Sequence, residues 1–543
     1  MTPKSVKVLY AAIVIAVAWI TLAPLGTIGV RLLRESRHFS LLWEPSTLNA
    51  LSVTLRATAA SLLLSLAIAI PGSWFLCRTD LPFRARFRRI LLFPYLIPPY
   101  LIAIAWISLA VPKIGFLNRF ISEDFLNIYS FSGLVWVFAS AYLPILLAPL
   151  CNAMDAMDPS LEEAARICGA RPWKVFLKIS LPCAAPVIAA ASILFSLDIM
   201  SAFGIPALIG NPGRLYVLTT LVYSHAKMGG LQGTNQAFLI SLWLLFFTVL
   251  FLLLNEWVRK KFGARLTSGK APRQSVLPLG KWRAPVALAF GLLTFLLVVL
   301  PIGAVIINSF LRIAGDLRLS NLSLENYRYL FQMPELSRAL GNSLYLSFIT
   351  ALVCVVLGFL IAYFKDRTGL PGKEWLNRLS TFPFAIPGTV IALALIVSFG
   401  TGWGNPDIAL LGSSLLLLVA YILKYMALSV QSLTPAMSRI DPSLDEAARI
   451  SGAGVWKMLR SILVPLMAPT LASIFLLTML PVFSELTMSV LLVGPGIETV
   501  GTLLFQLQDY ANPLAACSLA ALIIAVLVVT LPLMRKLGRG RFS

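Results

Sequence analysis

The sequence predicts an all-α polytopic membrane protein with about twelve transmembrane helices in two parallel six-helix repeats. Three observations support this fold class. Of the 543 residues, 58% are hydrophobic and only 12% are charged, long apolar runs recur along the chain, and one segment occurs twice. This composition excludes the soluble, disordered, collagen-like and disulfide-scaffold classes.

Twelve apolar runs are long enough to cross the hydrocarbon core, which takes about 20 residues of helix. They lie near residues 8–30, 50–76, 90–112, 131–154, 183–207, 236–257, 284–310, 341–364, 379–400, 409–432, 466–493 and 513–534. The third run contains Pro98 and Pro99 and is expected to be kinked or re-entrant. The first run lacks a clear signal-peptide cleavage site, so we expect it to be a retained span.

The 44 Lys and Arg exceed the 23 Asp and Glu, and their placement favours a membrane topology over nucleic-acid binding. With the N-terminus inside, cytoplasmic segments hold 31 of these cations and outer segments hold 11, while Arg56 and Lys424 fall within spans. Both termini are therefore predicted to be cytoplasmic. Residues 266–283 form a basic cytoplasmic linker between a first half, 1–265, and a second half, 284–543.

One cytoplasmic segment occurs in both halves. DPSLEEAARICGARPWKVFLKISLP, residues 158–182, matches DPSLDEAARISGAGVWKMLRSILVP, residues 441–465, without a gap. Further upstream, RTDLP at 78–82 recurs as RTGLP at 367–371. Because six spans per half is an even number, the halves enter the membrane in the same sense, which predicts a central pathway between two similar half-bundles.

Each copy of this segment predicts a short helix, a glycine bend and a second helix on the cytoplasmic surface. Asp158 and Asp441 suit helix caps that precede a proline at the first helical position. Gly169 and Gly452 can end the helix because glycine tolerates a positive φ. One copy alone would fit an ordinary surface helix resting on lipid headgroups. Two near-identical copies in otherwise divergent halves indicate a partner that presents two like surfaces.

The pattern Glu-Ala-Ala, three residues, Gly, nine residues, Ile, one residue, Leu-Pro resembles the loop with which bacterial ABC importer permeases dock on their ATP-binding subunits. The matching residues are Glu163, Ala164, Ala165, Gly169, Ile179, Leu181 and Pro182 in the first copy, and Glu446, Ala447, Ala448, Gly452, Ile462, Val464 and Pro465 in the second. The resemblance covers nearly the whole chain. It implies a type I ABC importer permease fold in one fused chain, with coupling loops at residues 155–182 and 438–465.

This chain is not expected to be an enzyme or to hold a cofactor. No GxxxxGK[ST] phosphate loop occurs, since Lys373 is followed by Glu374 and Lys270 by Ala271. The six dispersed Cys and two His show no metal or redox pattern. The resemblance implies two copies of a separate subunit that binds ATP and Mg²⁺, an external solute-binding protein and a bacterial inner-membrane location.

Asp198 and Glu485 are predicted to lie in the middle of the fifth and eleventh spans. A charge at the helix centre costs roughly 2.5 to 3.5 kcal/mol on insertion scales, so both side chains should face the interior. They are the candidate translocation-pathway residues, with Arg56 and Lys424 as candidate counter-charges. A structural carboxylate hydrogen-bonded to a neighbouring helix is the alternative for each.

The substrate class rests on a weaker resemblance. FPYLIPPYLIAIAW at 93–106 and IPGTVIAL at 386–393 are similar to fused permeases for ferric iron, while similar fused chains serve thiamine and split relatives serve polyamines, sulfate or phosphonates. A secondary carrier driven by an ion gradient shares the span count but would not need the duplicated segment. An integral membrane enzyme lacks a nucleophile or metal motif here.

Overall fold

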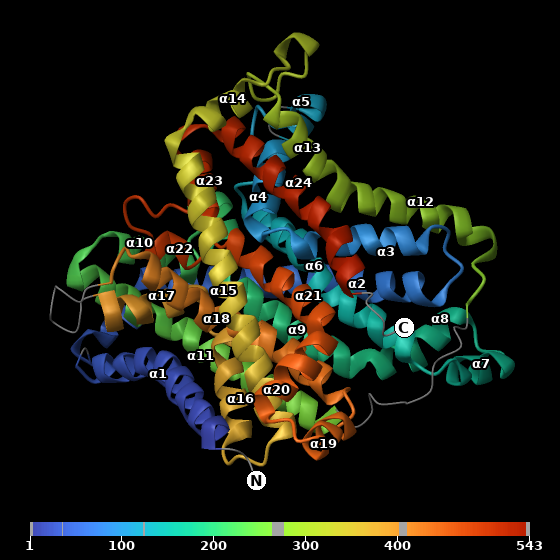
Figure 1. The fold of residues 1–543 in the computed structure, drawn as a ribbon. Coiled ribbons are helices and arrows are strands. Elements are labelled where there is room, and N and C mark those ends of the chain that lie inside the picture. Colours follow the sequence, from blue (N-terminus) through green and yellow to red (C-terminus); the bar gives the residue numbers. More distant parts are fainter. Residues whose placement is uncertain (1–3, 35, 123–124, 263–275, 401–409, 539–543) are drawn as a thin grey trace.

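The computed structural model describes residues 4–34, 36–122, 125–262, 276–400 and 410–538. These residues form helices throughout, and their only β-structure is two isolated bridges, Thr79 with Leu277 and Leu311 with Leu322. The all-α fold class predicted from the sequence is confirmed. Figure 1 shows the helices packed as one bundle.

The described residues of the first half form five long α-helices and six short ones. The long helices are α1 (Lys4–Arg34), α2 (Pro45–Arg78), α6 (Phe131–Ala156), α9 (Leu181–Ser201) and α11 (Gly230–Phe262). The short ones are α3 (Arg84–Leu92), α4 (Pro99–Ala110), α5 (Phe116–Ile121), α7 (Pro159–Ile167), α8 (Pro172–Val175) and α10 (Leu218–Lys227).

The second half follows the same order. Its main helices are α12 (Arg283–Thr294) with α13 (Leu300–Ser309), α15 (Pro334–Arg367), α18 (Ser414–Ser438), α21 (Val464–Phe483) and α24 (Pro513–Gly538). Its short helices are α14 (Glu325–Gln332), α16 (Lys373–Thr381), α17 (Gly388–Leu395), α19 (Ser443–Ile450), α20 (Val455–Met458), α22 (Ser489–Leu492) and α23 (Val500–Gln506).

Ten helices of the described chain are long and apolar enough to cross a membrane, and up to twelve spans result if each of two bent pairs counts as one. The pairs are Arg84–Leu96 with Pro99–Ala110, bent by 107°, and Lys373–Ala385 with Gly388–Phe399, bent by 106°. The bends fall at Pro98 and Pro387, where a proline cannot donate the next helical hydrogen bond. The expected kink in the third run is confirmed, and the ninth run repeats it.

The first helix of each half packs against the other half (Figure 1). In α1, Tyr10 Oη donates a hydrogen bond to the carbonyl of Pro371 (2.7 Å), and its ring meets Phe364 edge-on. In α12, the Phe290 ring lies 5.8 Å from that of Phe75 and 6.1 Å from that of Phe87. Neither half therefore buries its own apolar surface without the other.

The described end of the linker runs beside the C-terminal end of α2. The Leu277 amide donates to the Arg78 carbonyl (2.9 Å), and the Asp80 amide donates to the Leu277 carbonyl (3.1 Å). The Leu277 side chain is buried with Trp74 and Phe176. Residues 266–275 of the predicted linker lie outside the described residues.

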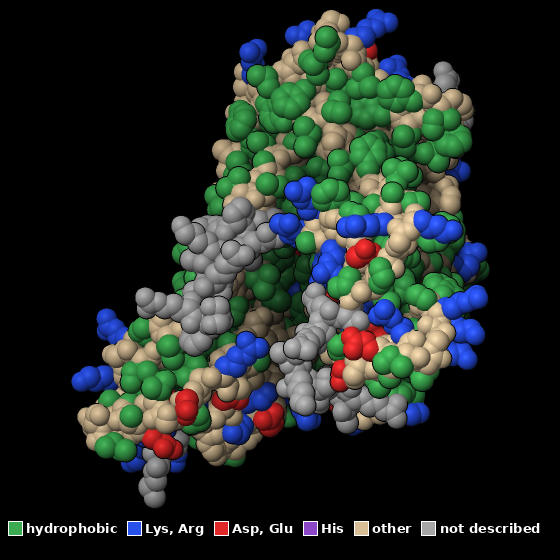
Figure 2. Space-filling view, turned by 90° about the vertical axis from the view of Figure 1, so that its right-hand side faces the viewer, with side chains coloured by type: hydrophobic (Ala, Val, Ile, Leu, Met, Phe, Trp, Pro, Cys, Tyr) green, Lys and Arg blue, Asp and Glu red, His purple; other side chains and the backbone are tan. Residues whose placement is uncertain are grey.

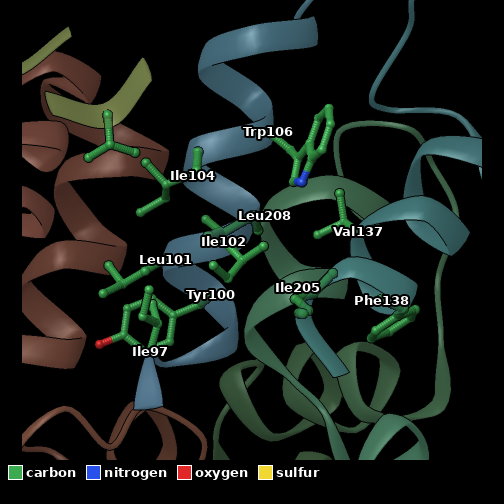
Figure 3. Close-up of a cluster of buried hydrophobic side chains, with 14 of the residues drawn as sticks. Ile97, Tyr100, Leu101, Ile102, Ile104, Trp106, Val137, Phe138, Ile205 and Leu208 are labelled. Atoms are coloured by element: carbon green, nitrogen blue, oxygen red, sulfur yellow. The ribbon is translucent and has the colours of Figure 1, made fainter. Parts of the chain in front are cut away.

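Helix α4 is enclosed by protein on all sides. Every side chain from Tyr100 to Ala110 is buried, and Figure 3 shows this helix against Val137 and Phe138 of α6 and against Ile205 and Leu208. Because α4 meets protein rather than lipid, its starting bend at Pro98 lies inside the bundle. The bend therefore exposes backbone and polar groups to the interior between the halves.

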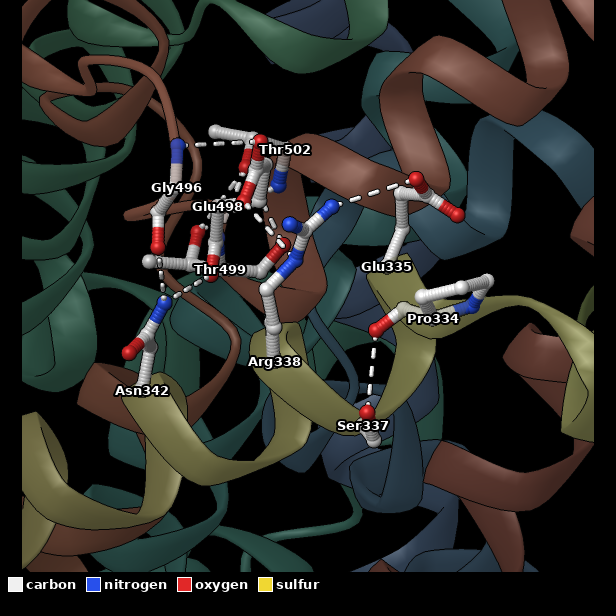
Figure 4. A network of polar contacts seen from close by, with 9 residues as sticks. All are labelled: Pro334, Glu335, Ser337, Arg338, Asn342, Gly496, Glu498, Thr499 and Thr502. Atoms are coloured by element: carbon white, nitrogen blue, oxygen red, sulfur yellow. Dashed lines mark hydrogen bonds and ion pairs between the residues drawn. The ribbon is translucent and has the colours of Figure 1, made fainter.

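The N-terminal end of α15 is tied to the segment before α23 by polar contacts (Figure 4). Arg338 forms ion pairs with Glu335 (3.1 Å) and Glu498 (4.0 Å). Asn342 Nδ2 donates to the carbonyl of Glu498 (2.9 Å). These contacts join two segments of the second half, and none of their residues lines the cavity described below.

The surface pattern fits a protein embedded in lipid. Figure 2 shows a broad hydrophobic area on one face, with Lys and Arg gathered below it. Exposed apolar side chains such as Leu288 and Leu292 of α12 contribute to lipid-facing surface of this kind. An apolar band bounded by cations is the pattern expected where helices leave the inner side of a bilayer.

Candidate functional site: two repeated short helices and a central cavity

Helix α7 forms as its sequence predicts. The Asp158 carboxylate accepts a hydrogen bond from the Ser160 amide (3.0 Å), and Pro159 is the first helical residue. After the helix, Gly169 takes a φ of +81°, which only glycine adopts without strain. The chain then continues through α8 and one π-turn, Phe176–Ser180, directly into α9.

Helix α19 repeats this geometry with one difference. The helix begins at Ser443, so Pro442 is the cap and not, as predicted, the first helical residue. Asp441 still accepts a hydrogen bond from the Ser443 amide (2.9 Å), and this bond lowers the pKa of its carboxyl below the usual value. Gly452 ends the segment with a φ of +74°, which confirms the predicted glycine bend in both copies.

The two helices expose matching side chains. We call α7 and α19 the coupling helices, after the role that the resemblance implies. Glu163 and Ala164 are exposed, as are Glu446 and Ala447, whereas the second alanine faces the chain itself: Ala165 is half-buried and Ala448 is buried. Of the two small residues predicted to allow close approach of a partner, only the first alanine of each pair, Ala164 or Ala447, is exposed. Ile167 and Ile450 are 87% and 88% exposed at equivalent positions.

A buried acidic residue in each coupling helix was not singled out from the sequence. Glu162 lies next to Arg78, the last residue of α2, and Asp445 lies next to Arg367, the last residue of α15. The side chains of all four residues are at most 5% exposed. The sequence does mark the two arginines as equivalent, because both belong to the repeated RTxLP motif. A motif alone does not tell which acid an arginine will meet.

A cavity of about 370 Å³ lies between the halves. Its wall combines the first bend, the ends of α9 and α21, and α18; the polar and aromatic lining residues include Tyr95, Tyr100, Tyr142, Asp198, Lys424, Tyr425 and Glu485. The structure therefore brings the two predicted pathway carboxylates and the counter-charge Lys424 to one space. Arg56 is not part of its lining, and its guanidinium lies over the Phe131 ring instead.

Neither carboxylate stands in the middle of a span, which corrects the prediction. α9 ends at Ser201, so Asp198 lies in its last turn, and α21 ends at Phe483, so Glu485 lies beyond its end. The predicted fifth and eleventh spans are too long, because apolar residues continue in the sequence beyond the ends of both helices. In α21, Pro481 weakens the helix just before its end.

The two carboxylates have different surroundings. Glu485 is buried and accepts hydrogen bonds from the amides of Met488 (2.9 Å) and Ser489 (3.0 Å) and from Ser489 Oγ (2.6 Å). Glu485 therefore accepts from the two amides at the start of α22, whose N-cap residue is Met488. Asp198 is half-buried, and no described residue forms a hydrogen bond or ion pair with its carboxylate within the usual distances. Its charge faces the cavity.

Lys424 provides the positive charge of the cavity wall. Its ammonium donates to the carbonyls of Phe384 (2.8 Å) and Ile386 (2.6 Å), which lie at the second bend. Pro387 has no amide hydrogen and cannot serve as the donor that the Phe384 carbonyl would otherwise meet three residues later, so this carbonyl needs another partner. Lys424 thus stabilises the bend and places a cation opposite the carboxylates.

The fold and the duplicated coupling helices define a two-repeat helical membrane permease. A family model described as the binding-protein-dependent transport system inner membrane component matches residues 69–266 and 354–537, more than half of the chain. The chain belongs to this family, and it is a multi-pass inner-membrane protein. The two matched regions fall in the two predicted halves.

Three curated relatives share between 22% and 28% sequence identity with this chain. A putative ferric transport system permease of Haemophilus influenzae is 26% identical over 391 residues, which are 70% of this chain and 60% of that protein. A second protein of that organism, an Fe(3+)-transport system permease, is 22% identical over 508 residues, 92% of each chain. A putative 2-aminoethylphosphonate transport permease of Salmonella paratyphi A is 28% identical over 201 residues, 37% of this chain and 73% of that protein.

Proposed function

We propose that this chain is the permease of an ATP-driven ABC importer, and that each coupling helix receives one copy of an ATP-binding subunit. The observation that carries the proposal is the duplicated cytoplasmic surface, in which Ile167 and Ile450 stand almost fully exposed at equivalent places. An aliphatic side chain left in water at both sites suits burial in a partner's pocket. Two like sites suit two like subunits.

The proposal includes the orientation and the external partner. Both termini and the coupling helices lie in the cytoplasm, and a solute-binding protein delivers the solute from outside. The family description, a binding-protein-dependent system, supports this partner. Tags placed after Lys261 or Ser543 should be protected in intact cells, and tags near Arg34 or Asp316 should be accessible.

Reconstitution tests the energy source. The purified chain alone should hydrolyse no ATP, and hydrolysis should appear only with the cognate ATP-binding subunit in the same vesicle. Uptake should then require ATP inside and binding protein outside. ATP turnover by the chain alone, or uptake driven by a proton or sodium gradient without the subunit, would contradict the proposal.

We propose ferric iron as the solute. Two relatives whose names refer to iron support it, one of them aligned over 92% of this chain. The free carboxylate of Asp198 supplies the hard oxygen donor that a ferric ion prefers. The described residues contain no group of three His, Cys, Asp or Glu that could hold a metal ion, so this passage would involve brief contact with single donors and no closed coordination site.

A zwitterionic aminophosphonate is the second candidate. The cavity presents a cation, Lys424, as well as the free carboxylate of Asp198, and one relative is named for 2-aminoethylphosphonate. Uptake of radiolabelled ferric iron and of labelled 2-aminoethylphosphonate should be compared in cells with and without the chain. Iron uptake that disappears with the chain, with phosphonate uptake unchanged, is the expected result. The reverse pattern would replace iron by the phosphonate.

A further inference from the structure

The buried arginine at the end of α2 joins three segments of the first half. Arg78 Nη2 donates to the carbonyl of Met157, just after α6 (2.8 Å), and Arg78 Nε lies 3.8 Å from Glu162 Oε1 of α7. Ser180 Oγ, which precedes α9, donates to the same carboxylate oxygen (2.7 Å). The side chains of Arg78 and Glu162 are only 3% and 1% exposed. The coupling helix is thus attached to the ends of membrane helices.

The second half repeats the pairing of a buried arginine with an acid of the coupling helix and with a backbone carbonyl, although a different guanidinium nitrogen lies nearest to the carboxylate. Arg367 Nη2 donates to the carbonyl of Ile440, the repeat equivalent of Met157, and Nη1 lies 3.5 Å from Asp445 Oδ2. Arg367 also donates to the carbonyl of Met437 at the end of α18 (3.2 Å). Asp445 is the repeat equivalent of Glu162 and is one methylene shorter. The guanidinium, the carbonyl and the carboxylate therefore recur together.

Stability alone is a weak reason for such a pair. Desolvation of two buried ions offsets much of their attraction, and an apolar pair of similar volume often stabilises a fold as well. Here Glu162 Oε2 and Asp445 Oδ1 accept no hydrogen bond from the described residues, so neither pair is fully satisfied. An ionic pair can hold two helix ends at a fixed distance, whereas a loose apolar contact cannot.

We propose that Arg78 and Arg367 are positioning residues for energy coupling. Each fixes its coupling helix to the cytoplasmic ends of two membrane helices, so that a displacement of the docked ATP-binding subunit moves all three as one unit. This inference rests on the proposed function. It concerns the transmission of movement and not the docking surface itself, since the four buried side chains offer nothing to a partner.

The test uses near-isosteric variants in the reconstituted complex of chain, ATP-binding subunit and binding protein. Glu162→Gln and Asp445→Asn remove the charge. We expect the ATP-binding subunit to co-purify within about twofold of the wild-type amount, because the exposed face of the coupling helix is unchanged. Solute taken up per ATP hydrolysed should fall at least tenfold. Glu162→Asp should restore the ratio to within about threefold, because the second half uses aspartate.

Two further variants keep the test decisive. If Glu162→Gln does not fold, Ser180→Ala removes only one hydrogen bond to Glu162 and should lower the ratio severalfold in a folded complex. Arg88→Gln is the matched control, because Arg88 pairs with Asp155 (2.6 Å) on the same side but does not contact a coupling helix. Its ratio should stay at the wild-type value.

The outcomes separate the two proposals. A wild-type complex without ATP-dependent uptake would refute the proposed function. Coupled wild-type uptake together with unchanged ratios in Glu162→Gln and Asp445→Asn would refute the positioning role alone. So would a loss confined to the amount of assembled complex with a normal ratio in what remains, since this is the result that a purely structural ion pair gives.

Discussion

The two coupling helices and the central cavity of this molecule differ in how closely they follow the internal repeat. At the coupling helices the halves match in glycine bends, exposed isoleucines and buried arginine pairs. In the cavity they differ. At the repeat offset Asp198 corresponds to Pro481, Glu485 to Ala202 and Lys424 to Ala141, so every charge has an uncharged counterpart.

This difference indicates what each surface meets. Two copies of one partner require two like docking surfaces, and a substitution in either copy would spoil one of them. A single solute in a cavity between the halves meets both walls at once, so the walls are free to differ. The comparison therefore predicts equal effects for equivalent cytoplasmic substitutions and unequal effects for the cavity carboxylates.

The largest effect is expected from Gly169→Glu or Gly452→Glu. Each glycine has a positive φ, so any side chain is strained there, and glutamate adds an unpaired charge beside the docking surface. No neighbouring atom lies within 4 Å of an added Cβ, so the protein should still fold in the membrane. Uptake should fall to background in both variants, measured with co-purification of the ATP-binding subunit. Wild-type uptake in both would remove the coupling role of these segments.

Glu485→Ala should destabilise the fold by about 2 to 5 kcal/mol, because it leaves two buried amides without an acceptor. Thermal or denaturant unfolding in detergent measures this loss. Asp198→Ala is the internal comparison, and its stability should lie within about 0.5 kcal/mol of the wild type, as no hydrogen bond is lost. Equal destabilisation by both variants would show that the two carboxylates are equivalent after all.

Ile167→Ser and Ile450→Ser test the symmetry of the docking surface. If each isoleucine is buried on docking, its loss should cost roughly 1.5 to 3 kcal/mol, or about ten- to a hundredfold in affinity for the ATP-binding subunit. The two variants should weaken binding equally, as measured by titration of the subunit onto detergent-purified chain. A clear effect in one variant and none in the other would break the proposed equivalence of the helices.

The smallest effect is expected from Asp198→Asn. The substitution preserves volume and removes only the charge that faces the cavity, so we expect uptake to fall about tenfold, which corresponds to about 1.4 kcal/mol. Association with the ATP-binding subunit should not change. Uptake at the wild-type rate would exclude Asp198 from the pathway.

The sequence predicted the repeat, the helical class and the bend at Pro98 because these depend on local composition and spacing. The position of Glu485 was missed because apolar residues continue beyond the end of α21, and hydropathy does not register where a helix stops. The burial of Glu162 was missed for another reason. Glu162 and Glu163 are neighbours of the same type, and only the contacts of Glu162 with Arg78 and Ser180 distinguish the buried one from the exposed one.

The exchange of first helices between the halves also constrains biosynthesis. Tyr10 finds its partner carbonyl at Pro371, 361 residues later in the chain. At about 5 to 20 residues per second of synthesis, α1 waits roughly 20 to 70 s in the bilayer before that partner exists. Two separate chains would have to find each other during this interval by diffusion. In a single polypeptide the second half is made in a one-to-one ratio with α1 and stays covalently attached to it, so the contact can form within each chain.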